Sequence, residues 1–263
     1  MRKMLGLSAK AKRADAARPS LPNYVASPIQ GACARFSLAD MLTATNHWAP
    51  QLLVGDGHRV LFKGVDPRDG VTPWLLKRCR ARESEEFHAE VAEMGNKNHP
   101  NLLRLLGYCN EQDKLWRWEK VVVYECMPGG SLLDKFGPHG STARVPLTLQ
   151  QRLGILIGVA RGLEYLHSFG LVHRSVSLRS ISLDGSMQAK LAGFDYVTRS
   201  EAAAGREHAV VGEPGYVDPQ LELTRELTPT NDLYSLGVVL LQLLSGRIFD
   251  TSGRPMQKFF RDT

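Results

Sequence analysis

Gly55 and Gly57 lie two residues apart in LLVGDGHRVLFKGV, a segment whose composition favours strands around a turn. Glycine lets the backbone approach a phosphate group closely, because no side chain stands between them. The same pair also fits a hairpin turn that binds nothing. Both interpretations are open at this point, since two glycines alone are a weak motif.

Three serines, Ser175, Ser177 and Ser180, lie in the segment VHRSVSLRSISLD. A serine hydroxyl cannot accept a developing proton as a carboxylate does, and it is a poor ligand for a hard cation. The four cysteines show no CxxC spacing, and the eight histidines form no HExxH pair. These patterns predict neither a metal site nor a disulfide framework.

The composition is that of an ordinary globular protein, with 43% hydrophobic and 23% charged positions among 263 residues. The net charge is +6, but the first twenty residues hold six basic side chains and one acidic one. The remainder is therefore close to neutral, which argues against a nucleic-acid binder. Because no run of about eighteen apolar residues occurs, the sequence predicts no membrane-spanning helix.

Hydrophobic periodicity predicts a sheet-rich first half and a helix-rich second half. A flexible basic segment is expected over residues 1–34, helices at 36–48 and 84–97, and strands near 52–65, 71–78, 101–109 and 120–126. A long helix over 147–167 is predicted to pack through one apolar face. That face comprises Leu149, Leu153, Leu156, Ala160, Leu163 and Leu166. A further apolar helix over 231–246 is expected to end at Gly246 as its C-cap.

In order and wording, these segments resemble the protein kinase domain, and most closely the plant receptor-like kinase family. The motifs that carry the resemblance are FSLADMLTATNHW, HPNLLRLLGYC, RLGILIGVARGLEYLH, GYVDP and NDLYSLGVVLLQLLSGR. The resemblance implies an α+β, two-lobed fold over residues 35–263. Its N-lobe (about 35–127) would be strand-rich with one main helix, and its helical C-lobe (about 128–263) would be incomplete, leaving one side of the 231–246 helix uncovered.

The resemblance also implies candidate nucleotide-binding residues. Gly55 and Gly57 match the start of the glycine-rich loop, although Arg59 lies near the place of the third glycine. Lys77 and Glu90 match the lysine–glutamate pair that orients the phosphates. This pair can still form, although its role could now be structural only.

Glu125 and Met127 complete the nucleotide-binding candidates. Leu75 stands where the family usually has a small alanine against the adenine ring. A larger side chain in a tight slot is hard to accommodate, so Leu75 could itself fill the adenine pocket. In the alternative interpretation, Pro73 shifts the strand and Leu75 points elsewhere.

By the same resemblance, VHRSVSLRSISLD aligns with the HRDxKxxN catalytic loop. Ser175 then replaces the catalytic Asp, Ser177 the phosphate-steadying Lys, and Ser180 the magnesium-binding Asn. Gly193 replaces the first residue of the DFG motif. Asp195 lies two residues further on, roughly 6 to 7 Å if extended, which is too far to replace it without remodelling. No intact catalytic residue is expected.

Four residues are expected to preserve the structural core that the resemblance implies. His173, Phe194 and Met94 could stack as a hydrophobic column between the lobes. Asp232 matches the residue that anchors the backbone of the catalytic loop.

The activation segment departs from the family pattern as well. Glu213 replaces a usual Thr, and Gln220 replaces the Glu of the APE motif. Thr198 and Ser200 are candidate phosphorylation sites, whose phosphate Arg174 could bind.

The expected function is therefore that of a catalytically inactive kinase-like domain, a pseudokinase, acting as a scaffold or regulator in receptor-kinase-type signalling. Two alternatives are a weak ATP-binding Ser/Thr kinase that uses Lys77, Glu90 and Asp195, and a degenerate fragment without function. No cofactor is expected, and ATP would bind only without efficient magnesium binding. The expected partner is an active receptor-like kinase or co-receptor, with no nucleic acid. The expected location is the cytoplasm, with membrane contact through the basic N-terminal segment or a missing upstream transmembrane helix at the inner face of the plasma membrane.

Overall fold

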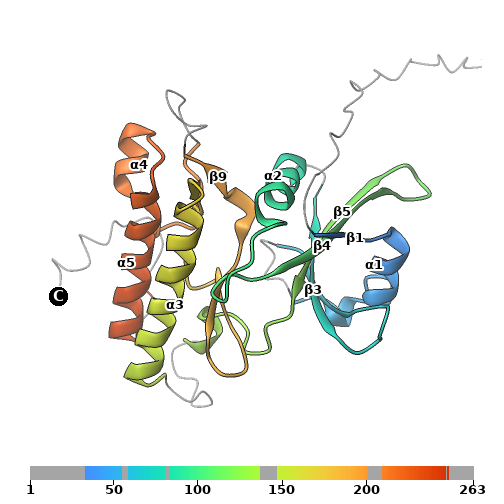
Figure 1. Ribbon diagram of the computed structural model, residues 1–263, viewed down its shortest axis with the longest axis horizontal. Helices are drawn as coiled ribbons and strands as arrows, with labels where there is room; N and C mark the ends of the chain where they lie inside the picture. Colours follow the sequence, from blue (N-terminus) through green and yellow to red (C-terminus); the bar gives the residue numbers. More distant parts are fainter. Residues whose placement is uncertain are drawn as a thin grey trace, which may run out of the picture.

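The computed structural model describes residues 33–54, 59–80, 83–136, 147–200, 209–246 and 248. Gly55 and Gly57, together with residues 1–32 of the predicted basic segment, lie outside these ranges. Strands gather on one side of the molecule and the long helices on the other, as Figure 1 shows. Within the described ranges, no helix has both the length and the apolar character needed to cross a membrane.

Five strands form the main sheet of the first lobe. They are β1 (Ala34–Arg35), β2 (Leu61–Val65), β3 (Pro73–Cys79), β4 (Leu105–Gln112) and β5 (Trp118–Glu125). Their order is β1-β4-β5-β3-β2; β1 runs parallel to β4, and the other neighbours are antiparallel. Because side chains alternate along a strand, the two faces of this sheet enter different cores.

Helix α1 (Leu38–Ala44) covers one face of the sheet, and α2 (Ser84–Met94) covers the other (Figure 1). Ser37 begins α1 with a capping box, in which its hydroxyl accepts from Asp40 N and the Asp40 carboxylate accepts from Ser37 N. Trp74 and Leu76 of β3 pack on the α1 side. On the opposite face, α2 buries Phe87 and further residues against the core that joins the lobes.

The second lobe contains α3 (Leu149–His167), α4 (Pro219–Thr224) and α5 (Pro229–Ser245). Two short antiparallel pairs complete it, β6 (Leu171–Val172) with β9 (Thr198–Arg199) and β7 (Ile181–Leu183) with β8 (Ala189–Leu191). Short 3₁₀ turns are η1 (Pro50–Leu52), η3 (Leu133–Lys135) and η4 (Phe194–Tyr196). Gly246 ends α5 with φ +68°, which confirms the predicted C-cap.

The apolar face predicted for α3 is wrong at Leu149, Leu153 and Ala160, which are all exposed. Leu149 and Leu153 are 63% and 44% exposed. The buried residues are Ile155, Gly158, Val159, Gly162, Leu163 and Leu166. Gly158 and Gly162 determine this orientation. A Cβ on Gly162 would lie 2.8 Å from the Asn101 carbonyl oxygen, and a Cβ on Gly158 would lie 2.8 Å from Asn101 Nδ2. The glycine-bearing face is the one that can approach neighbouring backbone closely.

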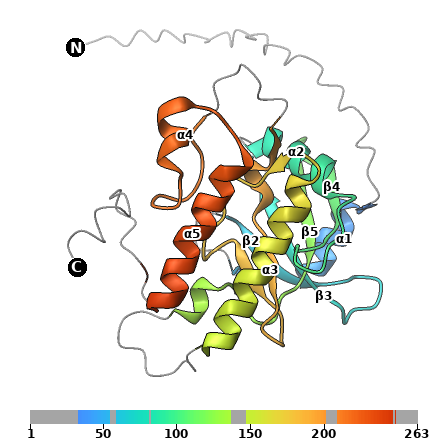
Figure 2. The same cartoon turned by 60° about the vertical axis from the view of Figure 1, so that its left-hand side comes forward.

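An apolar groove of about 380 Å³ lies between α3 and α5, which run side by side in Figure 2. It is lined by Leu156, Ile157, Ala160, Leu233, Leu236, Gly237 and Leu240. Ile157, Leu233 and Leu244 are exposed. The described residues therefore leave one side of α5 uncovered, as the sequence predicts.

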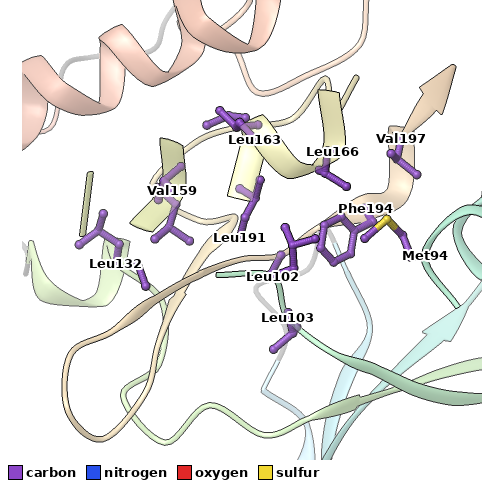
Figure 3. Close-up of a cluster of buried hydrophobic side chains, with 14 of the residues drawn as sticks. Met94, Leu102, Leu103, Leu132, Val159, Leu163, Leu166, Leu191, Phe194 and Val197 are labelled. Carbon is purple, nitrogen blue, oxygen red and sulfur yellow. The ribbon is translucent and has the colours of Figure 1, made fainter. Parts of the chain in front are cut away.

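A single hydrophobic cluster joins the two lobes. It brings Met94 of α2 and Leu102, which lies between α2 and β4, together with Leu163 and Phe194 of the second lobe, and Figure 3 shows Met94 beside the Phe194 ring. The architecture is α+β and two-lobed, which confirms the predicted fold class.

Candidate functional site

Four charged residues meet between the sheet, α2 and η4. On β3, Lys77 Nζ contacts Glu90 Oε2 of α2 and lies 2.6 Å from Asp195 Oδ1 of η4. Arg59, two residues before β2, places Nη2 2.7 Å from Asp195 Oδ2. Tyr124 of β5 donates its hydroxyl proton to Glu90 Oε1. We call Arg59, Lys77, Glu90 and Asp195 the ionic cluster.

Strand register explains why these groups meet. Lys77 pairs with Val122 and Leu75 pairs with Tyr124 across β3 and β5. Residues two apart on a strand share a face, so Lys77, Leu75 and Tyr124 all point away from the α1 core. Glu90 is on the buried side of α2, which packs against the same face.

The ionic cluster balances its own charge, with two cations facing two carboxylates. Lys77 and Glu90 are buried, whereas the Arg59 and Asp195 side chains are 27% and 18% exposed. Burial alone would favour the neutral carboxyl group, but the Lys77 and Arg59 charges outweigh it and lower the pKa of Asp195 to about 2. Likewise, Glu90 and Asp195 outweigh burial and raise the pKa of Lys77. Burial raises the pKa of Glu90, although Lys77 opposes this shift. Arg59, Lys77 and Asp195 are therefore charged at neutral pH.

The sequence predicts that Asp195 lies too far from position 193 to replace the first residue of the DFG motif without remodelling. Gly193 has φ +79°, a left-handed conformation that favours glycine, and the chain then turns through η4. This turn shortens the path that an extended chain would take. The Asp195 carboxylate consequently reaches Lys77 in place of the side chain that Gly193 lacks.

Two of the three loop serines, Ser177 and Ser180, use their hydroxyls in local hydrogen bonds. Ser180 Oγ accepts from Ser177 N at 2.8 Å and donates to Ser177 O at 3.1 Å. Ser177 Oγ accepts from Arg179 N at 3.3 Å. Ser177 and Ser180 are almost fully buried, and Ser175 is buried as well. These hydroxyls stabilise the loop itself, as serine side chains commonly do in turns.

The donors at this site do not fit a magnesium ion of the kind that the family uses. Gly193 offers no side chain, the Ser180 hydroxyl is bonded within its loop, and the charge of Asp195 is already balanced by Lys77 and Arg59. Magnesium requires oxygen ligands in near-octahedral geometry. Within the described residues, no group of three or more His, Cys, Asp or Glu side chains could hold a metal.

The residues expected to preserve the core lie together. The His173 and Phe194 rings are 5.5 Å apart in an edge-to-face arrangement. Met94 lies beside Phe194 in Figure 3. Asp232 is buried and accepts from the backbone N–H groups of His173 and Arg174, both at 2.8 Å. The loop backbone is thus held by a carboxylate on α5.

His173 is held in one neutral form by its neighbours. Its Nε2 donates to Ala192 O at 3.0 Å, and its Nδ1 accepts from Ser175 N at 3.2 Å. Burial lowers the pKa of His173 below its ordinary value. A neutral ring with its proton on Nε2 satisfies both contacts, so this histidine acts as a structural group.

The remaining nucleotide-binding candidates lie at the end of β5, just beyond it, and on β3. Glu125 Oε1 accepts from Lys190 Nζ at 2.6 Å and from Arg104 N at 2.8 Å. Met127 and Leu75 are partly buried against the core that joins the lobes. Pro73 does not displace the strand, because β3 pairs with β2 and β5 in unbroken register. Leu75 therefore lies on the same face as Lys77.

The altered activation-segment residues have new partners. Glu213 Oε1 lies 3.1 Å from Arg179 Nε of the serine loop. Gln220 lies at the start of α4, where its N–H donates to the Asp218 side chain at 2.9 Å. The Arg179–Glu213 ion pair is a local contact between the serine loop and the activation segment.

The two phosphorylation candidates lie in or next to β9. Thr198 pairs with Val172 of β6, and Ser200 N donates to Gly170 O at 2.8 Å. Arg174 Nη2 donates to Ala209 O at 2.6 Å. This part of the segment is therefore ordered by backbone pairing without a phosphate group.

Sequence reasoning missed two members of this site. Arg59 was considered only as an obstacle at a glycine position, and Tyr124 was not singled out. A signal for Tyr124 is its spacing, since it lies two residues beyond the position opposite Lys77. For Arg59, the signal is a basic residue near the place of a family glycine just before β2, together with a glycine at position 193.

The two-lobed fold with a lysine–glutamate pair between sheet and helix defines a protein-kinase-like class of protein. The family model for protein tyrosine and serine/threonine kinases matches residues 71–259. The chain therefore belongs to the protein kinase family.

Three relatives from Arabidopsis thaliana illustrate this placement. The chain is 35% identical over 239 residues to the serine/threonine-protein kinase PBL35. This match covers 84% of the chain and 47% of PBL35. Identity is 34% to a probable receptor-like protein kinase and 35% to a probable LRR receptor-like serine/threonine-protein kinase, covering 82% and 81% of the chain. The chain spans only 25% and 24% of the length of these two relatives.

Proposed function

We propose that this chain is a pseudokinase domain that transfers no phosphoryl group and acts as a scaffold or regulator in receptor-kinase-type signalling. The observation that carries the proposal is the ionic cluster. Its lysine and arginine are paired with Asp195 and Glu90, while Gly193 and Ser180 stand at the two positions that hold magnesium in relatives. Electrostatic stabilisation of a transferring phosphate is the main task of a kinase site.

The acceptor side of the reaction also lacks its base. Ser175 stands in place of the catalytic Asp, and its hydroxyl cannot accept a proton as a carboxylate does. Each 1.36 kcal/mol added to the barrier lowers the rate about tenfold. The combined loss of base and metal ligands lowers the rate by many powers of ten.

Nucleotide binding is proposed to be weak and independent of magnesium. Leu75 lies on the cleft side of β3 and packs against the joint core, where it reduces the space for an adenine ring. A phosphate group would also have to compete with Asp195 for both cations. No cofactor is therefore proposed.

The role as a scaffold rests on the preserved framework. Asp232 holds the loop backbone, and the His173 ring of that loop packs on Phe194. These contacts are preserved although the catalytic residues that they would position are replaced. We propose a protein partner, an active receptor-like kinase or co-receptor, since relatives are named as receptor-like kinases. The proposed location is the cytoplasm at the inner face of the plasma membrane.

Nucleotide-induced thermal shift, measured with and without Mg²⁺, tests the state of the pocket. We expect no magnesium-dependent rise in the unfolding midpoint at millimolar ATP, because a ligand stabilises only the state that it binds. The kinase domain of an active receptor-like relative serves as the positive control. A clear magnesium-dependent stabilisation of this chain would overturn the proposal.

The weak-kinase alternative has one observation in its favour, the contact between Asp195 and Lys77. If Asp195 recruited magnesium, its Asp195→Asn variant would lose a magnesium-dependent ATP shift that the unaltered chain shows. The degenerate-fragment alternative predicts no cooperative unfolding. A single cooperative transition of the purified chain would reject it.

A further inference from the structure

The ion pair between Arg59 and Asp195 connects the two halves of the cleft. Arg59 lies at the entrance to β2 in the sheet lobe, whereas Asp195 lies in η4, directly after β8 of the other lobe. Their charged atoms are 2.7 Å apart. The same carboxylate also contacts Lys77, so Asp195 receives one cation from β3 and one from the segment before β2.

The site is shaped to admit the guanidinium group. A Cβ on residue 193 would lie 2.9 Å from Arg59 Nη2 and 3.0 Å from Nη1. Residue 193 also has φ +79°, which is strained for residues with side chains. Gly193 is therefore complementary to Arg59, and the two departures from the family pattern fit one another in space.

The charge balance depends on the arginine as well. Without Arg59, Lys77 alone would face two carboxylates in a largely buried setting. An unpaired buried charge is costly, because it loses water without gaining a full partner. Arg59 thus supplies the second positive charge that keeps Asp195 ionised at this position.

We infer that Arg59 is an internal latch, which closes the cleft through Asp195 and removes the need for a bound nucleotide or metal to hold the lobes together. This inference rests on the proposed function, since it describes how a site without phosphoryl transfer is regulated. The closed arrangement is then a constant property of the folded chain. A partner that recognises the closed form would bind it whatever the ATP concentration.

Hydrogen exchange of the nucleotide-free chain tests the latch. Arg59→Ala should speed exchange of the amides over residues 193–197 about tenfold, the effect expected from losing one charge-assisted contact. Amides within α3 should be unaffected. Lys63→Ala is the matched control, because Lys63 is an exposed basic residue on the adjoining strand β2. Equal exchange in the Arg59→Ala and Lys63→Ala variants would overturn the latch.

A double-mutant cycle gives a second test that does not depend on one variant. Asp195→Asn removes the carboxylate charge, and Arg59→Lys keeps the positive charge in case Arg59→Ala does not fold. If the latch exists, Arg59→Ala adds little to the exchange rate in the Asp195→Asn background. Additive effects of the two substitutions would contradict it.

The two proposals fail in different ways. Magnesium-dependent stabilisation of the unaltered chain by ATP would overturn the proposed function. If the double-mutant cycle shows no coupling between positions 59 and 195, and ATP with magnesium does not stabilise the unaltered chain, the latch is overturned and the proposed function stands.

Discussion

Asp195 shows how one residue can stand at a catalytic centre and serve another purpose. Its carboxylate is surrounded by Lys77 and Arg59, which both lie within 2.7 Å. In an active site, these cations would act on the substrate. Here both cations form ion pairs with Asp195, which supports the proposal that this residue stabilises the contact between the lobes and not a transition state.

The charge on Asp195 should make its contribution to stability depend on pH. The pKa is lowered from 3.8 to about 2, so the contribution is complete above pH 4 and is lost as the pH falls through about 2. The linked free energy is about 2 kcal/mol at neutral pH and falls to about half of that near pH 3. We expect Asp195→Asn to show this loss in urea unfolding at pH 7. A loss of equal size at pH 7 and pH 3 would indicate a packing effect instead.

At the scale of elements, α3 illustrates how close contact with neighbouring backbone determines which face of a helix packs inward. The helix turns its glycines inward because a Cβ on Gly162 would meet the carbonyl oxygen of Asn101 at 2.8 Å. Gly154 lies on the same helix, with nothing within 4 Å of its hypothetical Cβ. Glycine is therefore required for steric reasons at position 162, whereas at position 154 it affects only helix propensity.

Alanine substitutions on α3 should have opposite effects at these two glycines. Gly162→Ala should destabilise the protein by about 1 to 3 kcal/mol, since backbone must shift to admit the methyl group. Gly154→Ala should stabilise it by about 0.5 to 1 kcal/mol through helix propensity. Chemical denaturation of both variants provides the measurement. A stabilising Gly162→Ala variant would show that α3 does not pack in this orientation.

Sequence reasoning predicted the main elements because periodicity and family motifs act locally. The helix at 231–246, its Gly246 cap and the strand containing Lys77 follow directly from pattern. The exposed Leu149 and Leu153 were mispredicted because periodicity alone gives no weight to glycine, which lets a helix pack closely. The Arg59–Asp195 contact joins residues 136 positions apart, and its turn at Gly193 depends on backbone conformation that no spacing rule specifies.

At the scale of the whole molecule, the described residues combine a continuous core with an uncovered apolar groove between α3 and α5. A core position contributes to folding, whereas an exposed apolar residue contributes mainly to association. Ile157 and Leu233 are exposed on this groove, whereas Leu163 of α3 is buried in the continuous core.

Substitutions at these positions should separate exposed from buried apolar residues. Ile157→Gln and Leu233→Gln should change the unfolding free energy by less than about 0.5 kcal/mol, because both side chains are exposed. Leu163→Ala, the buried comparison, should cost about 2 to 5 kcal/mol. Urea unfolding of the three variants provides the measurement. A large loss of stability in the glutamine variants would mean that the groove is covered in the folded chain.

The central claim is that this kinase-like chain does not transfer phosphate, and incorporation of labelled phosphate from magnesium ATP tests it most directly. The assay compares the purified chain with its Lys77→Met variant, using both autophosphorylation and a generic protein substrate. Because Ser175 stands at the position of the base and Gly193 at that of a magnesium ligand, we predict that the two proteins give the same signal as a reaction without enzyme. Incorporation by the unaltered chain that depends on magnesium and is lost in Lys77→Met would contradict the account.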